Sequence, residues 1–349
     1  MKRLALYTIA ALCFNASIVL ADELVLQEGV KEFVDTINKA GGKPIYTLTP
    51  VEARKVLTDL QASAKDIAPA QIETKTIEAD GKKIPLHIIR PENAKHALPV
   101  VMYFHGGGWI LGDFKTHERF LRELTNASNA AIVFVDYSPA PEAKYPTQIE
   151  EAYAATKWVA EHGKSLNLDA NKIAVAGDSV GGNMAAAVTL LAKEKKTPKI
   201  GFQVLFYPVT DANLDTESYK TFENGPWLTK KAMEWFWDAY LPNKADGKKI
   251  TASPLQASIE ELKGLPPALI ITDQNDVLRD EGEAYANKLM QAGVPVVATR
   301  YLGTIHDFVM LNALENSPTA RAAISQAGRT LWWFFNEDTI MKGKHKAKN

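Results

Sequence analysis

At residues 173–182 the chain reads Ile-Ala-Val-Ala-Gly-Asp-Ser-Val-Gly-Gly, an apolar run that leads into a serine flanked by glycines. The pattern Gly-x-Ser-x-Gly runs from Gly177 to Gly181, and an alanine-rich helical pattern follows it directly. A strand, a tight turn and a helix in this order form the context of a nucleophile elbow. Glycine suits such a strained turn because it has no Cβ, and the turn lifts the serine hydroxyl clear of the backbone. The segment therefore predicts that Ser179 is a nucleophile; the alternative is an ordinary glycine-rich turn.

Composition limits the class of protein. The chain has 349 residues, enough for one large α/β domain or two smaller ones. Its hydrophobic fraction of 46% and charged fraction of 23% are typical of a soluble globular protein. The formal net charge of -1 gives no electrostatic support for nucleic acid or an anionic membrane as a partner.

The N-terminus has the pattern of a secretory signal peptide. Lys2-Arg3 precede an apolar stretch over 4–20, and Ala21 ends it. We expect residues 1–21 to be cleaved, which predicts a periplasmic or secreted protein with 22–349 as its catalytic domain and no stable membrane insertion. The alternative is an uncleaved anchor, although the stretch lies at the low edge of spanning length. Cys13, the only cysteine, falls in this segment, so the mature chain needs no disulfide and has no thiol nucleophile.

Apolar runs alternate with helical patterns along the rest of the chain. Two helices are predicted first, at 24–40 and 50–65, the second with Thr49 as N-cap and Pro50 at its first position. Continuous Val/Ile/Leu runs indicate strands buried on both faces, so the fold class is α/β, with a mostly parallel sheet, an antiparallel start and flanking helices. The predicted strands are 72–78, 85–90, 99–104, 130–135, 173–176, 202–207, 268–271 and 294–301, and the later helices are 147–162, 228–241, 281–291 and 319–335.

One region breaks this alternation. Between Tyr207 and Leu269 no strand fits, and 228–241 reads as a helix dense in tryptophan and phenylalanine. With the N-terminal helices, this region predicts a helical lid over the carboxyl edge of the sheet; the alternative is a helical insertion packed on a sheet face.

A serine hydroxyl needs a base within hydrogen-bond reach and an acid that orients that base. In a sheet of this kind the chain order is serine, acid, histidine. Of the seven histidines, His306 is the one in a loop after the last predicted strand. The acid should follow strand 268–271. Asp276 is favoured because it lies between the strand tip and the next helix, with only a slight lead over Asp273, while Asp280 suits a structural place at the helix start.

Ester hydrolysis also needs N–H donors for a developing oxyanion. His105-Gly-Gly-Gly-Trp109 follows strand 99–104, and three glycines allow the backbone to approach a substrate closely. The N–H of Val180, at the start of the helix, is a further donor. The loop lacks phosphate-binding motifs, and the chain has no metal-ligand spacing, so no cofactor and no metal are expected.

These motifs resemble those of the bacterial hormone-sensitive-lipase-like (family IV) carboxylesterases of the α/β-hydrolase superfamily. The resemblance covers about residue 70 to the C-terminus and keeps the family's motif order. The motifs that carry it are His105-Gly-Gly-Gly-Trp109, Ile110-Leu-Gly-Asp113, Asp136-Tyr-Ser-Pro-Ala-Pro-Glu142, Gly177-Asp-Ser-Val-Gly-Gly-Asn183, Asp276-Val-Leu-Arg-Asp-Glu-Gly282 and Gly303-Thr-Ile-His306.

The resemblance implies a role for each matching residue. Ser179 is implied as nucleophile, His306 as base and Asp276 as orienting acid. The backbone N–H groups implied for the oxyanion hole are those of Gly107, Gly108 and Val180. It also implies an α/β-hydrolase fold with a helical cap, here from about 22–68 and 210–250. His105 is implied to brace the glycine loop, and Asp178 reads as structural. The chain departs from the family at Ser138-Pro139 and at Val277, neither of which removes a catalytic group.

The predicted function is that of a serine carboxylesterase acting on small short- to medium-chain esters without a cofactor. Alternatives are the same triad acting on acetylated sugars, lactones or amides, and a non-catalytic small-molecule binding protein on this fold. The oligomeric state stays open, with a homodimer as one alternative. The candidates for an apolar substrate pocket, each of which could equally be core or cap packing, are Trp109, Phe206, Tyr207, Phe222 and Trp227.

Overall fold

The strands of the chain form one eight-stranded sheet in the order β1-β2-β4-β3-β5-β6-β7-β8. The computed structural model describes residues 24–62, 64 and 67–346, with side chains to 337, so the predicted signal peptide and Cys13 lie outside the described residues. β1 and β2 form an antiparallel hairpin, β2 pairs antiparallel with β4, and all further pairings are parallel. This confirms the predicted sheet and its antiparallel start. The strands are β1 (Ala70–Ala79), β2 (Lys82–Pro91), β3 (Leu98–Phe104), β4 (Ala131–Val135), β5 (Leu168–Asp178), β6 (Phe202–Phe206), β7 (Ala268–Asn275) and β8 (Val296–Ile305).

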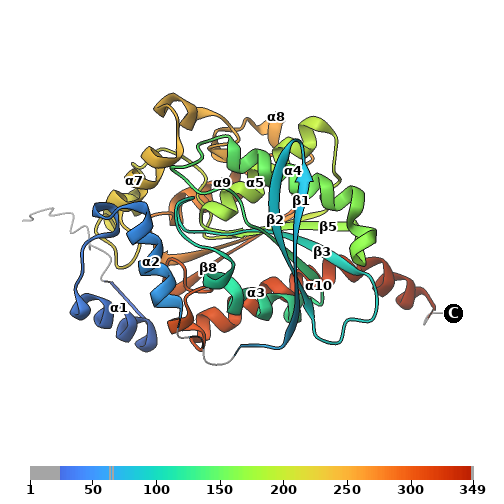
Figure 1. Ribbon diagram of the computed structural model, residues 1–349, viewed down its shortest axis with the longest axis horizontal. Coiled ribbons are helices and arrows are strands. Elements are labelled where there is room, and N and C mark those ends of the chain that lie inside the picture. Colours follow the sequence, from blue (N-terminus) through green and yellow to red (C-terminus); the bar gives the residue numbers. More distant parts are fainter. Residues whose placement is uncertain (1–23, 63, 65–66, 347–349) are drawn as a thin grey trace, which may run out of the picture.

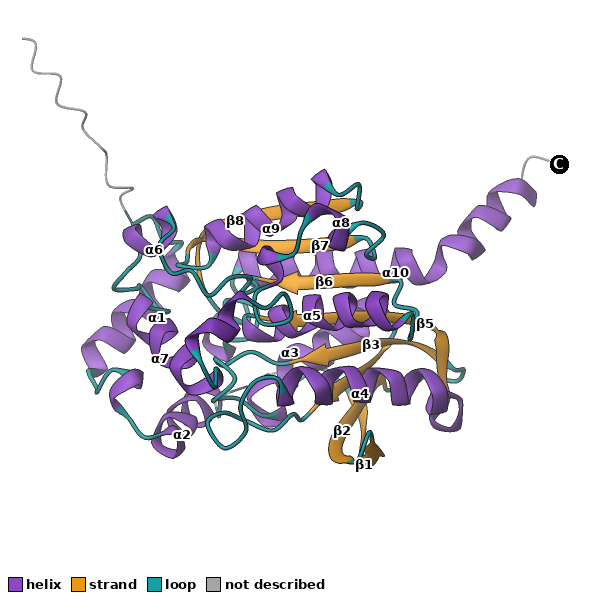
Figure 2. Ribbon diagram, turned by 90° about the horizontal axis from the view of Figure 1, so that it is seen from above, coloured by secondary structure: helices purple, strands orange, loops and turns teal. Residues whose placement is uncertain are grey.

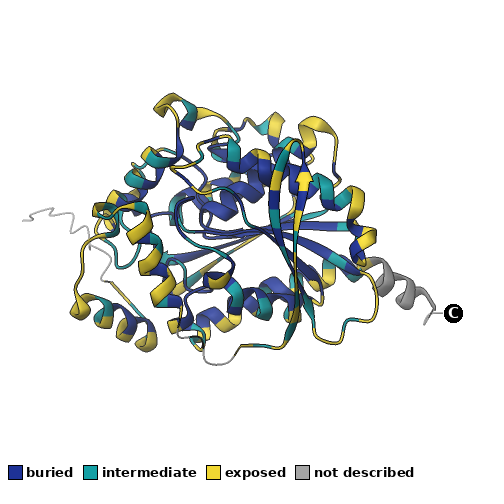
Figure 3. Cartoon of the chain, viewed as in Figure 1, coloured by how far each residue is buried: buried dark blue, intermediate teal, exposed yellow. Residues whose placement is uncertain are grey.

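Helices cover both faces of the sheet (Figure 1). α3 and α10 pack together on one face, and α4, α5 and α9 lie on the other. Figure 3 shows the strands between them as mostly buried, and every residue of β4 is buried, as expected for strands covered on both faces. The helices are α1 (Glu28–Ala40), α2 (Pro50–Gln61), α3 (Phe114–Ser128), α4 (Thr147–His162), α5 (Val180–Lys195), α6 (Glu217–Thr221), α7 (Lys230–Tyr240), α8 (Ile259–Leu262), α9 (Arg279–Gln291) and α10 (Pro318–Lys346).

Several helices differ from the sequence prediction: α3, α6 and α8 were not predicted, and α1, α2 and α10 have other bounds. α3 has apolar residues at helical spacing, and Asp113 and Thr116 form a capping box at its start, although its buried face also contains Arg119. α10 extends to Lys346 rather than ending at 335, which fits the high helix propensity of the lysines in this segment. In the described part of the chain, no helix is both long and apolar enough to cross a bilayer.

The helices predicted as a lid gather at one end of the sheet. Figure 2 shows α1, α2, α6 and α7 on the side toward which the parallel strands point. α2 begins as predicted, with Thr49 as N-cap in a capping box and Pro50 in its first turn, although it ends at Gln61. Ligands bind outside the carboxyl ends of the strands in open α/β sheets, so this end is where a site is expected.

Candidate active site

Ser179 lies in a strained turn between β5 and α5. Its φ of 55° and ψ of -122° are rare for a residue with a side chain, and such strain is typical of functional sites. The flanking glycines are required sterically. A Cβ on Gly177 would lie 2.2 Å from the carbonyl oxygen of Gly181, and a Cβ on Gly181 would lie 2.0 Å from that of Phe104. The pattern seen in the sequence is therefore a true elbow at the carboxyl end of the sheet.

The structure brings the serine, histidine and aspartate predicted for catalysis into one hydrogen-bonded chain. Ser179 Oγ lies 3.0 Å from His306 Nε2, and His306 Nδ1 lies 2.7 Å from Asp276 Oδ2. Asp276 Oδ1 also accepts the backbone N–H of Leu278 at 3.0 Å, which fixes the carboxylate. All three catalytic candidates are almost fully buried. This geometry allows His306 to accept the hydroxyl proton while Asp276 holds the other ring nitrogen.

Carboxylates surround His306 and favour its charged form. Burial lowers the pKa of His306, but the surrounding carboxyl groups, with the charge and hydrogen bond of Asp276 and the charge of Asp307 foremost, together raise the pKa above its ordinary value. Asp307 Oδ1 lies 3.4 Å from His306 Nε2, the nitrogen that faces Ser179. Sequence reasoning missed Asp307, although it directly follows the histidine. A raised pKa stabilises the imidazolium that forms when the serine is deprotonated.

Asp273, the close alternative for the acid, does not contact His306 through a hydrogen bond. It is fully buried on β7, shortly before Asp276 in the chain. Asp273, Asp276 and His306 form a group whose possible ligand atoms lie within 4.8 Å of one another. His306 Nδ1 is the ring nitrogen on this side, and it is already hydrogen-bonded to Asp276, so we assign no metal to the group.

The glycine loop presents free backbone donors beside the nucleophile. No hydrogen bond within the described chain uses the N–H of Gly107 or Gly108. Both residues have positive φ, 100° and 63°, which glycine adopts without strain. Above the loop, the ring of Phe236 in α7 packs so closely on Gly108 that a Cβ there would lie 2.1 Å from Cδ1. The loop and the start of α5 can therefore supply N–H groups to an oxyanion.

Replacing Gly108 with alanine is expected to lower kcat/KM on the order of 100-fold, because the new Cβ displaces either the loop or Phe236 and moves an oxyanion donor. Hydrolysis of p-nitrophenyl butyrate measures the effect. Gly264→Ala is the matched control: Gly264 also has positive φ, 73°, but a Cβ there meets no atom within 4 Å. Equal losses of activity in the two variants would contradict a specific role for the loop.

A buried polar network supports the glycine loop from below. Asp178 Oδ1 accepts the N–H of Gly106 at 3.0 Å and the hydroxyl of Tyr103, and Oδ2 lies 3.3 Å from His117 Nε2. Burial lowers the pKa of His117, but the charge and hydrogen bond of Asp178, with the bond to the Asp113 carbonyl and the charge of Asp307, together raise it above its ordinary value. Burial likewise raises the pKa of Asp178, while His117 and Tyr103 together lower it further than burial raises it. The pair is therefore ionised, and it ties the elbow to the loop.

His105 also braces the loop, as the family resemblance implied. Its Nδ1 lies 2.8 Å from the carbonyl oxygen of Gly106, and its ring stacks on Tyr137 with centroids 4.2 Å apart. Burial and the nearby His117 lower the pKa of His105 to about 4, so its imidazole is neutral at physiological pH.

Asp178→Asn is expected to destabilise the fold by about 3 kcal/mol, because it leaves the buried charge of His117 without its partner. The stability contributed by Asp178 is present above its ordinary pKa of 3.8 and is lost as pH falls through its lowered folded value. The stability contributed by His117 is fully present below its ordinary pKa of 6.5, and it is lost as pH rises through the raised pKa of the folded state. Urea unfolding from pH 3 to 9 measures the free energy of unfolding. For the wild type it should be highest at intermediate pH, and for the variant it should depend less on pH. An unchanged pH profile would refute the ion pair.

The predicted substrate-binding residues divide into two groups. Tyr207 and Trp227 reach the triad: the Tyr207 ring lies 4.7 Å from that of His306, and Trp227 Nε1 donates to Asp307 Oδ2 at 3.0 Å. The others pack elsewhere. Trp109 stacks on Tyr240, with centroids 3.8 Å apart, and contacts Trp237. Phe222 packs under the guanidinium of Arg279, and Phe206 contacts Phe120 below the sheet.

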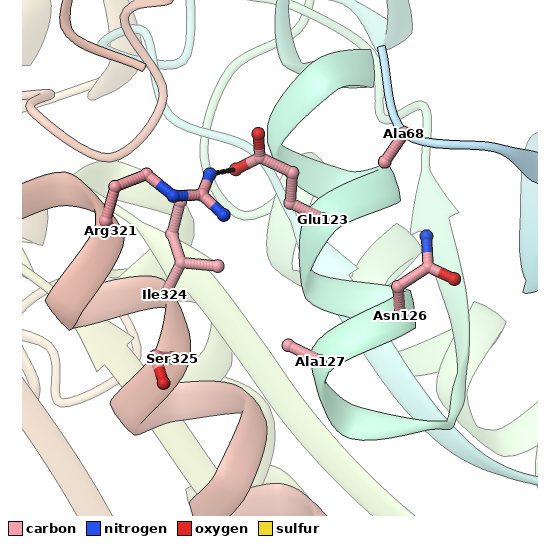
Figure 4. Close-up of a pocket in the computed structure, with 7 residues that line it drawn as sticks. All are labelled: Ala68, Glu123, Asn126, Ala127, Arg321, Ile324 and Ser325. Atoms are coloured by element: carbon pink, nitrogen blue, oxygen red, sulfur yellow. Dashed lines mark ion pairs between the residues drawn. The ribbon is translucent and has the colours of Figure 1, made fainter. Parts of the chain in front are cut away.

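A surface hollow between α3 and α10 is separate from the triad (Figure 4). Its polar feature is an ion pair of 2.7 Å between Arg321 and Glu123, and none of its lining residues belongs to the triad or the glycine loop. It offers no nucleophile with an adjacent base. The candidate chemistry of the described chain therefore stays at the carboxyl end of the sheet.

Comparison with known proteins identifies the family of the chain. The sequence model of a family described as having the alpha/beta hydrolase fold matches residues 101–310. Among solved structures, a thermostable esterase from Pseudomonas putida ECU1011 is similar, with 52% identity and a TM-score of 0.88 over 89% of this chain and 98% of that one. A protein of Acanthamoeba polyphaga mimivirus named as an α/β hydrolase is 46% identical over 295 residues, 84% of each chain. Carboxylesterase NlhH of Mycobacterium tuberculosis is 37% identical over 259 residues, 74% of this chain and 81% of its own.

The chain belongs to the α/β-hydrolase family, and within it to the hormone-sensitive-lipase-like group that its motifs resemble.

Proposed function

We propose that this protein is a serine carboxylesterase. The observation that carries the proposal is the hydrogen-bonded chain from Ser179 through His306 to Asp276, placed next to free N–H groups of a glycine loop. The similar proteins named esterases and carboxylesterases support ester hydrolysis as the reaction. No protein cofactor is needed for this chemistry, because the base, the nucleophile and the oxyanion donors are all part of the chain.

The reaction follows from the geometry in two halves. His306 Nε2 accepts the Ser179 proton as Oγ attacks the ester carbonyl, and the tetrahedral oxyanion is held by the N–H groups of Gly107, Gly108 and Val180. The same imidazolium then protonates the leaving alcohol, giving an acyl-enzyme. In the second half, His306 takes a proton from water, which attacks the acyl group and releases the acid and free Ser179.

The helical cap supports small esters as substrates. α1, α2, α6 and α7 cover the carboxyl end of the sheet, and Trp227 and Phe236 from this region contact Asp307 and Gly108. Aromatic rings over a buried nucleophile suit an apolar acyl group of limited length. Short- to medium-chain esters are therefore the substrate class we propose, with 22–68 and 210–250 as the cap.

The decisive experiment combines turnover with active-site labelling. Purified protein should hydrolyse p-nitrophenyl acetate and butyrate, and a fluorophosphonate should add to Ser179, located by peptide mass spectrometry. Kinetics over an acyl series from acetyl to palmitoyl should show kcat/KM falling for the long chains. Turnover without modification of Ser179, or modification at another serine, would reject the proposed nucleophile.

A further inference from the structure

Asp273 is a buried carboxyl group that the proposed reaction does not use. It is fully buried on β7, and neither of its oxygens has a hydrogen-bond donor within the described chain. An oxygen of Asp273 lies within 4.8 Å of both Asp276 and His306. An ionised carboxylate that is buried without a hydrogen-bond donor from the chain is strongly unfavourable. The group needs a physical explanation.

Two facing carboxyl groups are both acceptors when ionised, so they can bond only if one of them keeps a proton. Asp276 already receives two donors, His306 Nδ1–H at 2.7 Å and the Leu278 N–H at 3.0 Å, and these stabilise its negative charge. Asp273 receives none. The proton therefore belongs on Asp273, the less solvated of the two.

We propose that Asp273 is held in its neutral form and donates its proton to Asp276, making it a positioning residue for the triad. The donated hydrogen bond adds a third donor to the Asp276 carboxylate and withdraws negative charge from it. The Asp276 carboxylate that His306 faces therefore carries less negative charge and stabilises the imidazolium less. This inference rests on the proposed function, since it assigns a role within the same triad.

The electrostatic surroundings of Asp273 agree with a neutral form. Burial raises its pKa well above 3.8, and the charge of Asp276 raises the pKa further. The titratable groups that face this cluster come from five elements: Asp273 and Asp276 at the end of β7, His306 and Asp307 after β8, Tyr207 after β6, Tyr219 in α6, and Glu281 in α9. Tyr207 and Glu281 are also buried with raised pKa values, so neither supplies a counter-charge.

The proposal fixes the sign of a kinetic shift. The acid limb of kcat/KM against pH reports the protonation of His306 in the free enzyme. If Asp273 is a neutral donor, Asp273→Ala restores the full charge of Asp276 and moves the limb to higher pH by about half a unit. Asp273→Asn keeps a neutral N–H donor and should leave the limb at its wild-type position. An ionised Asp273 predicts the opposite: both variants lose a negative charge near His306, and both limbs move to lower pH.

The experiment measures kcat/KM of the wild type, Asp273→Asn and Asp273→Ala from pH 5 to 10 with p-nitrophenyl butyrate. Thermal unfolding of the same samples ensures that folded enzymes are compared. An upward shift in the alanine variant, absent in the asparagine variant, supports the proposal. A downward shift in both, or no shift in the alanine variant, overturns it.

Infrared spectroscopy provides a readout that does not depend on activity. The wild type at pH 7 should show a protonated-carboxyl C=O stretch that is missing in Asp273→Asn, whereas the contribution of buried Glu281 cancels between the two proteins. Absence of the difference band overturns the inference even if the esterase proposal holds. Presence of the band with no ester turnover instead contradicts the proposed function alone.

Discussion

Ser179→Ala is expected to lower kcat by at least about 10⁴-fold on p-nitrophenyl butyrate, because the variant has no oxygen to form the acyl-enzyme. His306 and the oxyanion donors remain in place, so a small residual rate from binding and electrostatics should persist. KM should change little, since the hydroxyl is lost from a pocket whose walls are intact. Stopped-flow measurements should also show that the burst of p-nitrophenol disappears.

Ser128→Ala is the matched control for this substitution. Ser128 is buried like Ser179, but its hydroxyl donates to the carbonyl of Leu124 within α3, on the other face of the sheet. It should retain nearly all activity and lose only a modest amount of stability. Retained turnover in Ser179→Ala, under conditions where Ser128→Ala is also active, would refute Ser179 as the nucleophile.

Asp276→Asn should lower kcat on the order of 10⁴-fold, because the substitution stabilises the wrong tautomer of His306. The N–H of Leu278 selects the oxygen of the new amide, which turns the NH₂ group toward His306 Nδ1. A neutral imidazole that accepts a hydrogen bond at Nδ1 carries its proton on Nε2. Because Nε2 faces Ser179, this tautomer of His306 cannot accept the serine proton. The loss should therefore be in kcat, with the fold preserved.

Raising the pH distinguishes this mechanism from simple loss of structure. Hydroxide can take over part of the role of the base, so the variant's deficit should narrow as pH rises. Asp169→Asn, the same change at the opposite end of β5, should have wild-type kinetics. Wild-type kcat in Asp276→Asn would show that a different carboxylate orients His306.

Local signals predicted the centre of the sheet, and they selected the serine, histidine and aspartate that the structure places in one hydrogen-bonded chain. The central strands β3 to β7 contain continuous apolar runs, and Gly177 and Gly181 are sterically required, so a short pattern was enough to find the elbow. His306 followed from chain order alone. Asp276 had only a slight lead over Asp273 in the sequence, because residues this close together on one strand tip cannot be separated by spacing. The hydrogen bond to His306 Nδ1 distinguishes them.

Features that depend on long-range contacts could not be predicted in this way. In α3, buried Arg119 pairs with Glu123 of its own helix, but most of its partners are Asn312 and the carbonyls of the distant segment 309–311, which no local pattern indicates. Asp178 was correctly read as structural, but its partners Gly106 and His117 lie far away in the sequence and could not be named from it. For Trp109 the sequence left pocket lining and packing equally open, and the structure shows its ring stacked on Tyr240.

The contact between Phe236 and Gly108 couples helix α7 to the glycine loop. The ring of Phe236, part of the proposed cap, also limits where the backbone of Gly108, a proposed oxyanion donor, can lie. Substitutions in α7 aimed at new substrates will therefore change the rate of the chemical step as well as the fit. Directed evolution of this protein should find its largest gains in pairs of changes, one in α7 and one in the glycine loop, rather than in either alone.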